Sequence, residues 1–137
     1  MWFNIIKSTT YYHVTRRNNA ENIIKEGRIK QGHSRGDFGS SGIWVWGEYE
    51  DAYDYFLDGL GTQGTREELI SLGQKANIND KVILKVELDV TPENMDRHRD
   101  ILVTWTGKSG AKGRLLNSAY VYRDSKDLVG KFTIIYP

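Results

Sequence analysis

Cysteine is absent from the 137-residue chain, so disulfide bonds and thiolate catalysis are both excluded. Proline occurs twice against 14 glycines, a balance that favours tight turns between short elements over rigid linkers. No apolar run approaches the length that spans a bilayer, and the run from Trp2 to Lys7 is too short for a secretion signal. We therefore expect a single cytoplasmic domain over residues 1–137, with no membrane partner.

The chain also lacks a large charge of either sign. Lys and Arg number 19 and Asp and Glu number 18, which gives a formal net charge of +1. Domains that bind nucleic acid by bulk electrostatics usually carry a clear basic excess, so the composition argues against that class. His33 and His98 have no partner at metal-ligand spacing, and no metal site is expected. A Gly-x-Ser-x-Gly elbow and a complete phosphate loop are absent too.

The stretch from residue 9 to residue 57 predicts a strand, a helix, a second strand and a second helix. β-Branched and aromatic residues favour the first strand, Thr9 to Thr15. The helix from about Asn19 to Glu26 has Asn18 as its expected N-cap and ends at Gly27. Its expected apolar stripe is Ala20, Ile23 and Ile24.

The second strand, Gly42 to Trp46, is apolar at every position after the glycine, which indicates that both of its faces are covered. The helix from about Tyr49 to Leu57 begins with acidic residues, which suit the positive end of a helix dipole. Polar loops are expected at Lys30–Ser41, Gly59–Gly64 and Gly107–Gly113. Later strands are expected at Lys81–Leu88, Ile101–Thr106, Ala119–Tyr122 and Lys131–Tyr136. Together these elements predict an α+β fold.

Three segments carry a resemblance to a known family. They are Tyr12-His13-Val14-Thr15, the helix Asn-Ala-Glu-Asn-Ile-Ile-Lys-Glu-Gly, and Gly42-Ile43-Trp44 followed by an acidic helix. Over about the first 56 residues the chain resembles the NAD-binding half of ADP-ribosyltransferases, in the branch of poly(ADP-ribose) polymerases, diphtheria-type toxins and tRNA 2′-phosphotransferases. The resemblance implies split antiparallel β-sheets, with helices packed on the N-terminal half, and NAD as the cofactor.

The resemblance also implies roles for the residues of the first strand. His13 would hydrogen-bond the adenosine ribose, the backbone of Val14 would hold the nicotinamide carboxamide, and Thr15 would complete the motif. The pyrophosphate would meet a nearby arginine, and Arg16, Arg17 and Arg35 are the candidates, because a guanidinium offers a fork of donors.

Aromatic residues are expected around the nicotinamide ring. By resemblance, Gly42 precedes Trp44, whose indole would pack on the ring, and Tyr55, thirteen residues past Gly42, would be a second stacking partner. A cationic pyridinium is held well between aromatic faces, each contact being worth about 1 kcal/mol. The spacing of Trp44 and Tyr55 is equally typical of core packing, and that alternative stays open.

Cleavage of the nicotinamide–ribose bond develops oxocarbenium character, which a nearby carboxylate stabilises. The family's glutamate usually precedes a strand near the C-terminus, and the matching position here holds Ala119. Asp96 and Asp100 are the candidate substitutes. Asp100 is taken as the catalytic carboxylate, alongside His13 and Trp44.

The predicted function is that of an NAD-dependent mono-ADP-ribosyltransferase of toxin or phage-effector size, acting on a protein, nucleic acid or small molecule. Two alternatives remain. The missing glutamate favours a catalytically inactive module that binds NAD, another nucleotide or a protein. An RNA 2′-phosphotransferase would require basic residues such as Arg16, Arg17 and Arg35 along the same cleft.

Overall fold

The computed structural model describes residues 9–30, 42–58, 67–71, 81–88, 95–107, 110–123 and 126–136. They form a mixed α+β fold in which every strand pairing is antiparallel. The polar loops expected at Lys30–Ser41 and Gly59–Gly64 lie almost entirely outside these residues.

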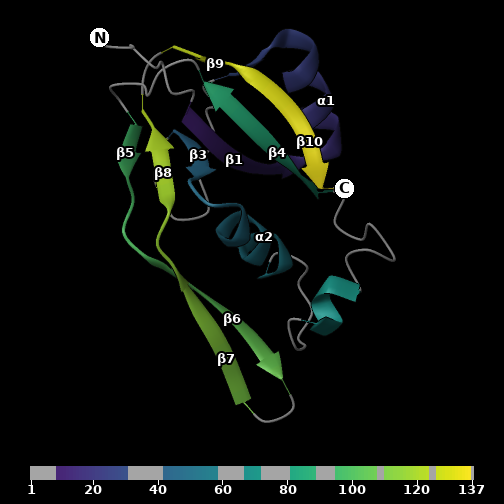
Figure 1. The fold of residues 1–137 in the computed structure, drawn as a ribbon, viewed down its shortest axis with the longest axis vertical. Coiled ribbons are helices and arrows are strands. Elements are labelled where there is room, and N and C mark those ends of the chain that lie inside the picture. The colour runs from purple at the N-terminus through teal and green to yellow at the C-terminus, as the bar shows by residue number, and fades with distance from the viewer. Residues whose placement is uncertain are drawn as a thin grey trace, which may run out of the picture.

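A six-stranded sheet forms the centre of the fold, with strand order β10-β4-β1-β3-β8-β5 (Figure 1). Its members are β1 (Thr9–Arg16), β3 (Ile43–Trp46), β4 (Lys81–Leu88), β5 (Met95–Arg97), β8 (Ala119–Tyr122) and β10 (Lys131–Tyr136). Two small sheets join β2 (Arg28–Ile29) to β9 (Leu128–Val129), and β6 (Ile101–Gly107) to β7 (Gly110–Leu116). The β6–β7 ribbon extends away from the main sheet (Figure 1).

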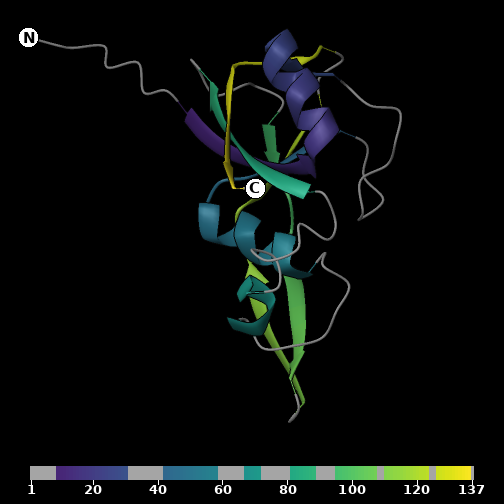
Figure 2. The same ribbon diagram turned by 90° about the vertical axis from the view of Figure 1, so that its right-hand side faces the viewer.

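Two helices cover opposite faces of the sheet, α1 (Arg17–Glu26) on one and α2 (Tyr49–Asp58) on the other (Figure 2). Strand β4 is buried on both sides as a result, because successive side chains of a strand point to opposite faces. As predicted, Val82, Leu84, Val86 and Leu88 share a face, the one under α1. Ile83 belongs to the cluster under α2.

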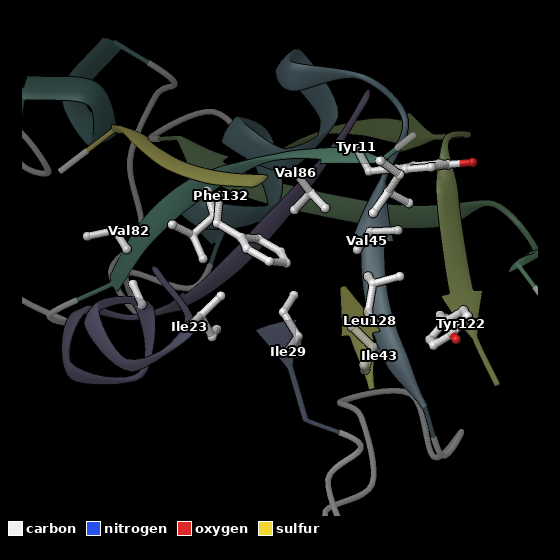
Figure 3. Close-up of a cluster of buried hydrophobic side chains, with 13 residues drawn as sticks. Tyr11, Ile23, Ile29, Ile43, Val45, Val82, Val86, Tyr122, Leu128 and Phe132 are labelled. Carbon is white, nitrogen blue, oxygen red and sulfur yellow. The ribbon is translucent and has the colours of Figure 1, made fainter. Parts of the chain in front are cut away.

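The core therefore consists of two layers separated by the sheet. Under α1, Ala20 and Ile23 pack against the strands together with Ile29, Ile43, Val45 and Phe132 (Figure 3). Under α2, the cluster contains Ala52, Phe56 and Leu57 of the helix, Leu69 of a helical segment at residues 67–71, and Trp46 and Ile83 of the sheet. The prediction that β3 is covered on both faces is confirmed.

The observed C-terminal limit of α1 agrees with the predicted one, but the N-terminal limit does not. The helix begins at Arg17, earlier than predicted, after an extended Arg16 at φ −72° and ψ 150° that makes no side-chain cap. The predicted cap, Asn18, accepts instead from the backbone N–H of its neighbour Asn19 at 2.9 Å. Gly27 ends the helix as expected, with φ 70° and an N–H that donates to the Ile23 carbonyl at 2.8 Å.

Two other predictions about these elements are wrong. Ile24 is expected in the apolar stripe but is 42% exposed, because a turn of about 100° from Ile23 puts it at the edge of the face that Ala20 and Ile23 bury. The segment Gly107–Gly113, expected as a loop, belongs to a hairpin. Gly107 at the end of β6 pairs with Gly110, the first residue of β7. Pairing with β6 outweighs the low strand propensity of this glycine-rich segment.

Two buried carboxylates of α2 attach the ribbon and β8 to the helix. Asp51 and Asp54 lie 2.6 Å and 2.7 Å from the guanidinium of Arg114 on β7. The second oxygen of Asp51 accepts from the backbone N–H groups of Asn117 and Ser118 and, at 2.7 Å, from the Ser118 hydroxyl. Burial works to lower the pKa of Arg114, but the two carboxylates together raise it above its ordinary value. Asp51 lies in the first turn of α2, as the acidic start of that helix predicts, and it is also a central structural contact.

Candidate functional site

The sheet forks between β1 and β3. The two strands are in register at one residue pair, Tyr12 with Trp46. Beyond that pair, the imidazole of His13 reaches across, and its Nδ1 donates to the carbonyl oxygen of Trp44 at 2.6 Å. A side chain thus joins the two strands where the backbone ladder between them stops. The fork leaves room for a cleft on the α1 side of the sheet.

A cleft of about 410 Å³ opens at this fork. It is lined by His13 and Thr15 of β1, Gly42, Ile43 and Trp44 at the start of β3, Asn19, Asn22, Ile23 and Glu26 of α1, and Arg28, Ile29 and Lys30 after the helix. Its volume is within the usual range for small-molecule and cofactor sites. Three isoleucines supply apolar surface, and the other side chains supply amides, a hydroxyl and charges, the usual combination in a ligand site.

The hydrogen bond to Trp44 fixes the state of His13. A carbonyl oxygen can only accept, so Nδ1 must carry the hydrogen, and in the neutral ring Nε2 is left as an acceptor. Burial lowers the pKa of His13 below its ordinary value of 6.5, although the bond to the Trp44 carbonyl works in the opposite direction. At neutral pH the ring is therefore an uncharged hydrogen-bond acceptor on the wall of the cleft.

The depressed pKa predicts a loss of stability in acid. As the pH falls below 6.5, the imidazole of the unfolded chain takes up a proton before that of the folded chain, so the unfolded state is favoured. The free energy of unfolding of the wild type, relative to a His13→Gln variant, should fall by at most about 1.4 kcal/mol per pH unit. Urea titrations between pH 5 and 7.5 would measure the difference. A difference that is constant, or that grows in acid, would contradict the assignment.

Gly42 lines the cleft in a backbone conformation that other residues rarely adopt. Its φ is 132°, and a Cβ at this position would meet Val121 Cγ1 at 2.7 Å and the carbonyl oxygen of Tyr122 at 2.8 Å. Only glycine therefore lets β3 lie this close to β8. The close approach is a physical reason for the glycine before Ile43 and Trp44.

Charged residues gather at the end of α1. Lys30 lies 3.5 Å from Glu26, and Arg28 lies 3.6 Å from Asp127. The basic side chains are 50% exposed for Arg28 and 65% exposed for Lys30. Exposed pairs of this kind are worth about 0–1 kcal/mol, so a bound anion can compete for either cation.

The predicted site residues divide into three groups. His13, Thr15, Gly42 and Trp44 line the cleft, although β1 and β3 are far apart in sequence. Val14, Arg16, Tyr55 and Asp100 do not line it. Arg35 lies outside the described residues.

Each residue of the second group has a local reason for its place. Val14 alternates with His13, so its side chain packs under α2, whereas its predicted role concerns the backbone alone. Arg16 is exposed at the start of α1. Asp100 is exposed after β5, 3.4 Å from Arg97. The ring of Tyr55 packs against Trp46, with 5.3 Å between centroids.

Trp44 contacts both sides of the sheet. Its carbonyl oxygen holds His13, while its indole packs against the cluster under α2 and lies 4.5 Å from the ring of His98. The indole belongs to the same cluster as Tyr55. The two rings predicted to enclose a ligand thus contribute to core packing.

The sequence did not indicate five polar residues that line the cleft: Asn19, Asn22, Glu26, Arg28 and Lys30. A usable signal exists for those on α1, because Asn19, Asn22 and Glu26 recur at i, i+3 and i+7 and so share one helix face. A polar helix face is ordinarily turned to water, and only the fork between β1 and β3 gives this one a second role.

The fold and cleft define an α+β protein with a ligand-sized site at a sheet fork. This chain matches no family model, no curated protein and no solved structure. Within the described residues, no helix is long and apolar enough to cross a membrane. Over the same part of the chain, no three His, Cys, Asp or Glu side chains form a group that could hold a metal ion.

Proposed function

We propose that this chain is an NAD-dependent mono-ADP-ribosyltransferase that binds NAD in the cleft at the fork of β1 and β3. The observation that carries the proposal is the convergence of His13 and Thr15 with Gly42 and Trp44 on one cleft. These residues carry the resemblance to ADP-ribosyltransferases, and they come from two segments of the chain. The near division of the main sheet at the pair Tyr12–Trp46 is compatible with the split sheets of that fold.

The chemistry of the cleft supports a dinucleotide ligand. The Nε2 acceptor of His13 suits a ribose hydroxyl, which can donate a hydrogen bond. Ile23, Ile29 and Ile43 offer apolar surface to a base or a nicotinamide ring. In this proposal Arg28 and Lys30 meet the pyrophosphate, in place of Arg16 and Arg35.

The same arrangement also determines what the protein does during the reaction. In this proposal the neutral ring of His13 and the hydroxyl of Thr15 orient the ligand. The bond from the ribose C1′ to the nicotinamide nitrogen breaks, and its electron pair leaves with nicotinamide. A nucleophile of the acceptor then attacks C1′ and loses its proton to solvent.

One observation favours a second candidate function, an NAD-binding module without catalysis. Ala119, where the resemblance expects a glutamate, is 1% exposed and packs under α2. A carboxylate introduced at that position would be buried away from water. Calorimetric titration with NAD, combined with chromatographic assay of released nicotinamide, separates the two functions. Binding with release of nicotinamide supports the transferase, binding without release supports the module, and the absence of binding contradicts both.

The hydroxyl of Thr15 gives a test of the ligand's position. Thr15→Val keeps the shape of the side chain and removes its hydrogen-bonding group, so we expect NAD to bind about three- to tenfold more weakly, as for the loss of one hydrogen bond. Thr10→Val is the matched control, because Thr10 is a half-buried threonine of the same strand that does not line the cleft. Calorimetry measures both variants. Equal affinities for NAD would place the ligand away from Thr15.

A further inference from the structure

One carboxylate faces the cleft. Among its described lining residues, Glu26 is the one acidic side chain. Asp96 is exposed on β5, which is separated from the fork by β8, and Asp100 is exposed beside Arg97. Ala119 is buried under α2. Negative charge within the described cleft therefore comes from the end of α1.

The position of Glu26 on its helix strengthens that charge. Glu26 is the last residue of α1, where unpaired backbone carbonyl groups carry partial negative charge. Gly27 ends the helix directly afterwards, and Glu26 lines the cleft together with the residues that follow it. Its ion-pair partner Lys30, 3.5 Å away, is 65% exposed, and because such exposed pairs are weak the carboxylate can act on another positive group.

We infer that Glu26 supplies the negative charge that the cleft sets against a cationic ligand group. The inference rests on the proposed function, in which this group is the pyridinium of NAD⁺. When the bond from C1′ to the ring nitrogen breaks, the electron pair goes to nicotinamide, and the positive charge passes to C1′ and the ribose ring oxygen. A carboxylate on the wall of the same cleft stabilises positive charge at either position.

The comparison of NAD⁺ with NADH isolates this charge, because the dihydronicotinamide ring of NADH is neutral. In Glu26→Gln, calorimetry should give NAD⁺ affinity about three- to tenfold weaker and NADH affinity unchanged, the size expected of a half-exposed charge interaction. Glu21→Gln is the matched control, since it removes the same charge from an exposed position of α1 that does not line the cleft. Lys30→Gln removes a pyrophosphate contact from both nucleotides and frees Glu26 from its partner, so both affinities should fall and that for NAD⁺ should fall less.

Turnover supplies a second readout with water as the acceptor. Glu26→Gln should lower the rate of nicotinamide release at saturating NAD⁺ at least tenfold, and Glu21→Gln should not. An unchanged NAD⁺-to-NADH preference in Glu26→Gln would overturn the inference and leave the proposed function standing. Wild-type protein that binds NAD⁺ without releasing nicotinamide would overturn the catalytic part. Wild-type protein that binds neither nucleotide would overturn the proposed function and this inference together.

Discussion

Replacing His13 by alanine should weaken NAD binding about 10- to 100-fold, which corresponds to roughly 1.4–2.8 kcal/mol. The variant loses the Nε2 acceptor on the cleft wall. It also loses the 2.6 Å hydrogen bond from Nδ1 to the Trp44 carbonyl, which joins β1 to β3 beyond their last paired residues. The ligand contact and the shape of the fork therefore fail together. Calorimetry with NAD measures the change.

His98→Ala is the matched control for this variant. His98 is also a half-buried histidine next to Trp44, with ring centroids 4.5 Å apart, but it does not line the cleft. Its replacement should leave NAD affinity within about threefold of wild type, since it removes no ligand contact. If the two variants lose affinity equally, the effect comes from disturbance of Trp44 and not from the imidazole in the cleft.

Asp51→Asn should lower the free energy of unfolding by about 2–3 kcal/mol, because it breaks the charge-assisted hydrogen bonds of a fully buried carboxylate. One oxygen of Asp51 forms an ion pair with Arg114, and the other accepts hydrogen bonds from Asn117 and Ser118. An asparagine has one acceptor oxygen, so its NH₂ group must face another donor on one of the two sides. Urea denaturation measures the loss.

Glu50→Gln removes the same charge from an exposed neighbour on α2 and should change stability by no more than about 0.5 kcal/mol. The large difference between the two variants follows from burial, since Asp51 is fully buried. Equal stabilities for Asp51→Asn and wild type would mean that α2 is held to the β6–β7 ribbon and to β8 by apolar packing alone.

The sequence predicted the elements whose patterns are long and local. Strand β4 has the predicted limits and buried face, and Gly27 ends α1 as expected. Strand β5, three residues with a polar centre, was not predicted, because its formation depends on pairing with β8. Strand β7 was not predicted for the same reason, because it contains two glycines and forms by pairing with β6. Non-local pairing does not leave a pattern in a single short segment.

The candidate site was only half accessible from the sequence, for a similar reason. Two short motifs contain His13, Thr15, Gly42 and Trp44, and these residues line the same cleft. The sequence does not predict that the polar face of α1 lines a cleft. That cleft exists because β1 and β3 diverge, and no local sequence pattern indicates the distance between two strands. Tyr55 has the spacing expected of a ligand contact, but its ring packs on Trp46. Helical spacing alone does not distinguish a packed aromatic residue from a stacking one.

A crystal structure of the protein with NAD tests the central claim most directly. We predict a dinucleotide in the cleft between α1 and the fork, with a ribose hydroxyl within hydrogen-bonding distance of His13 Nε2 and the pyrophosphate near Arg28 or Lys30. NAD bound elsewhere on the protein, with this cleft empty, would contradict the account.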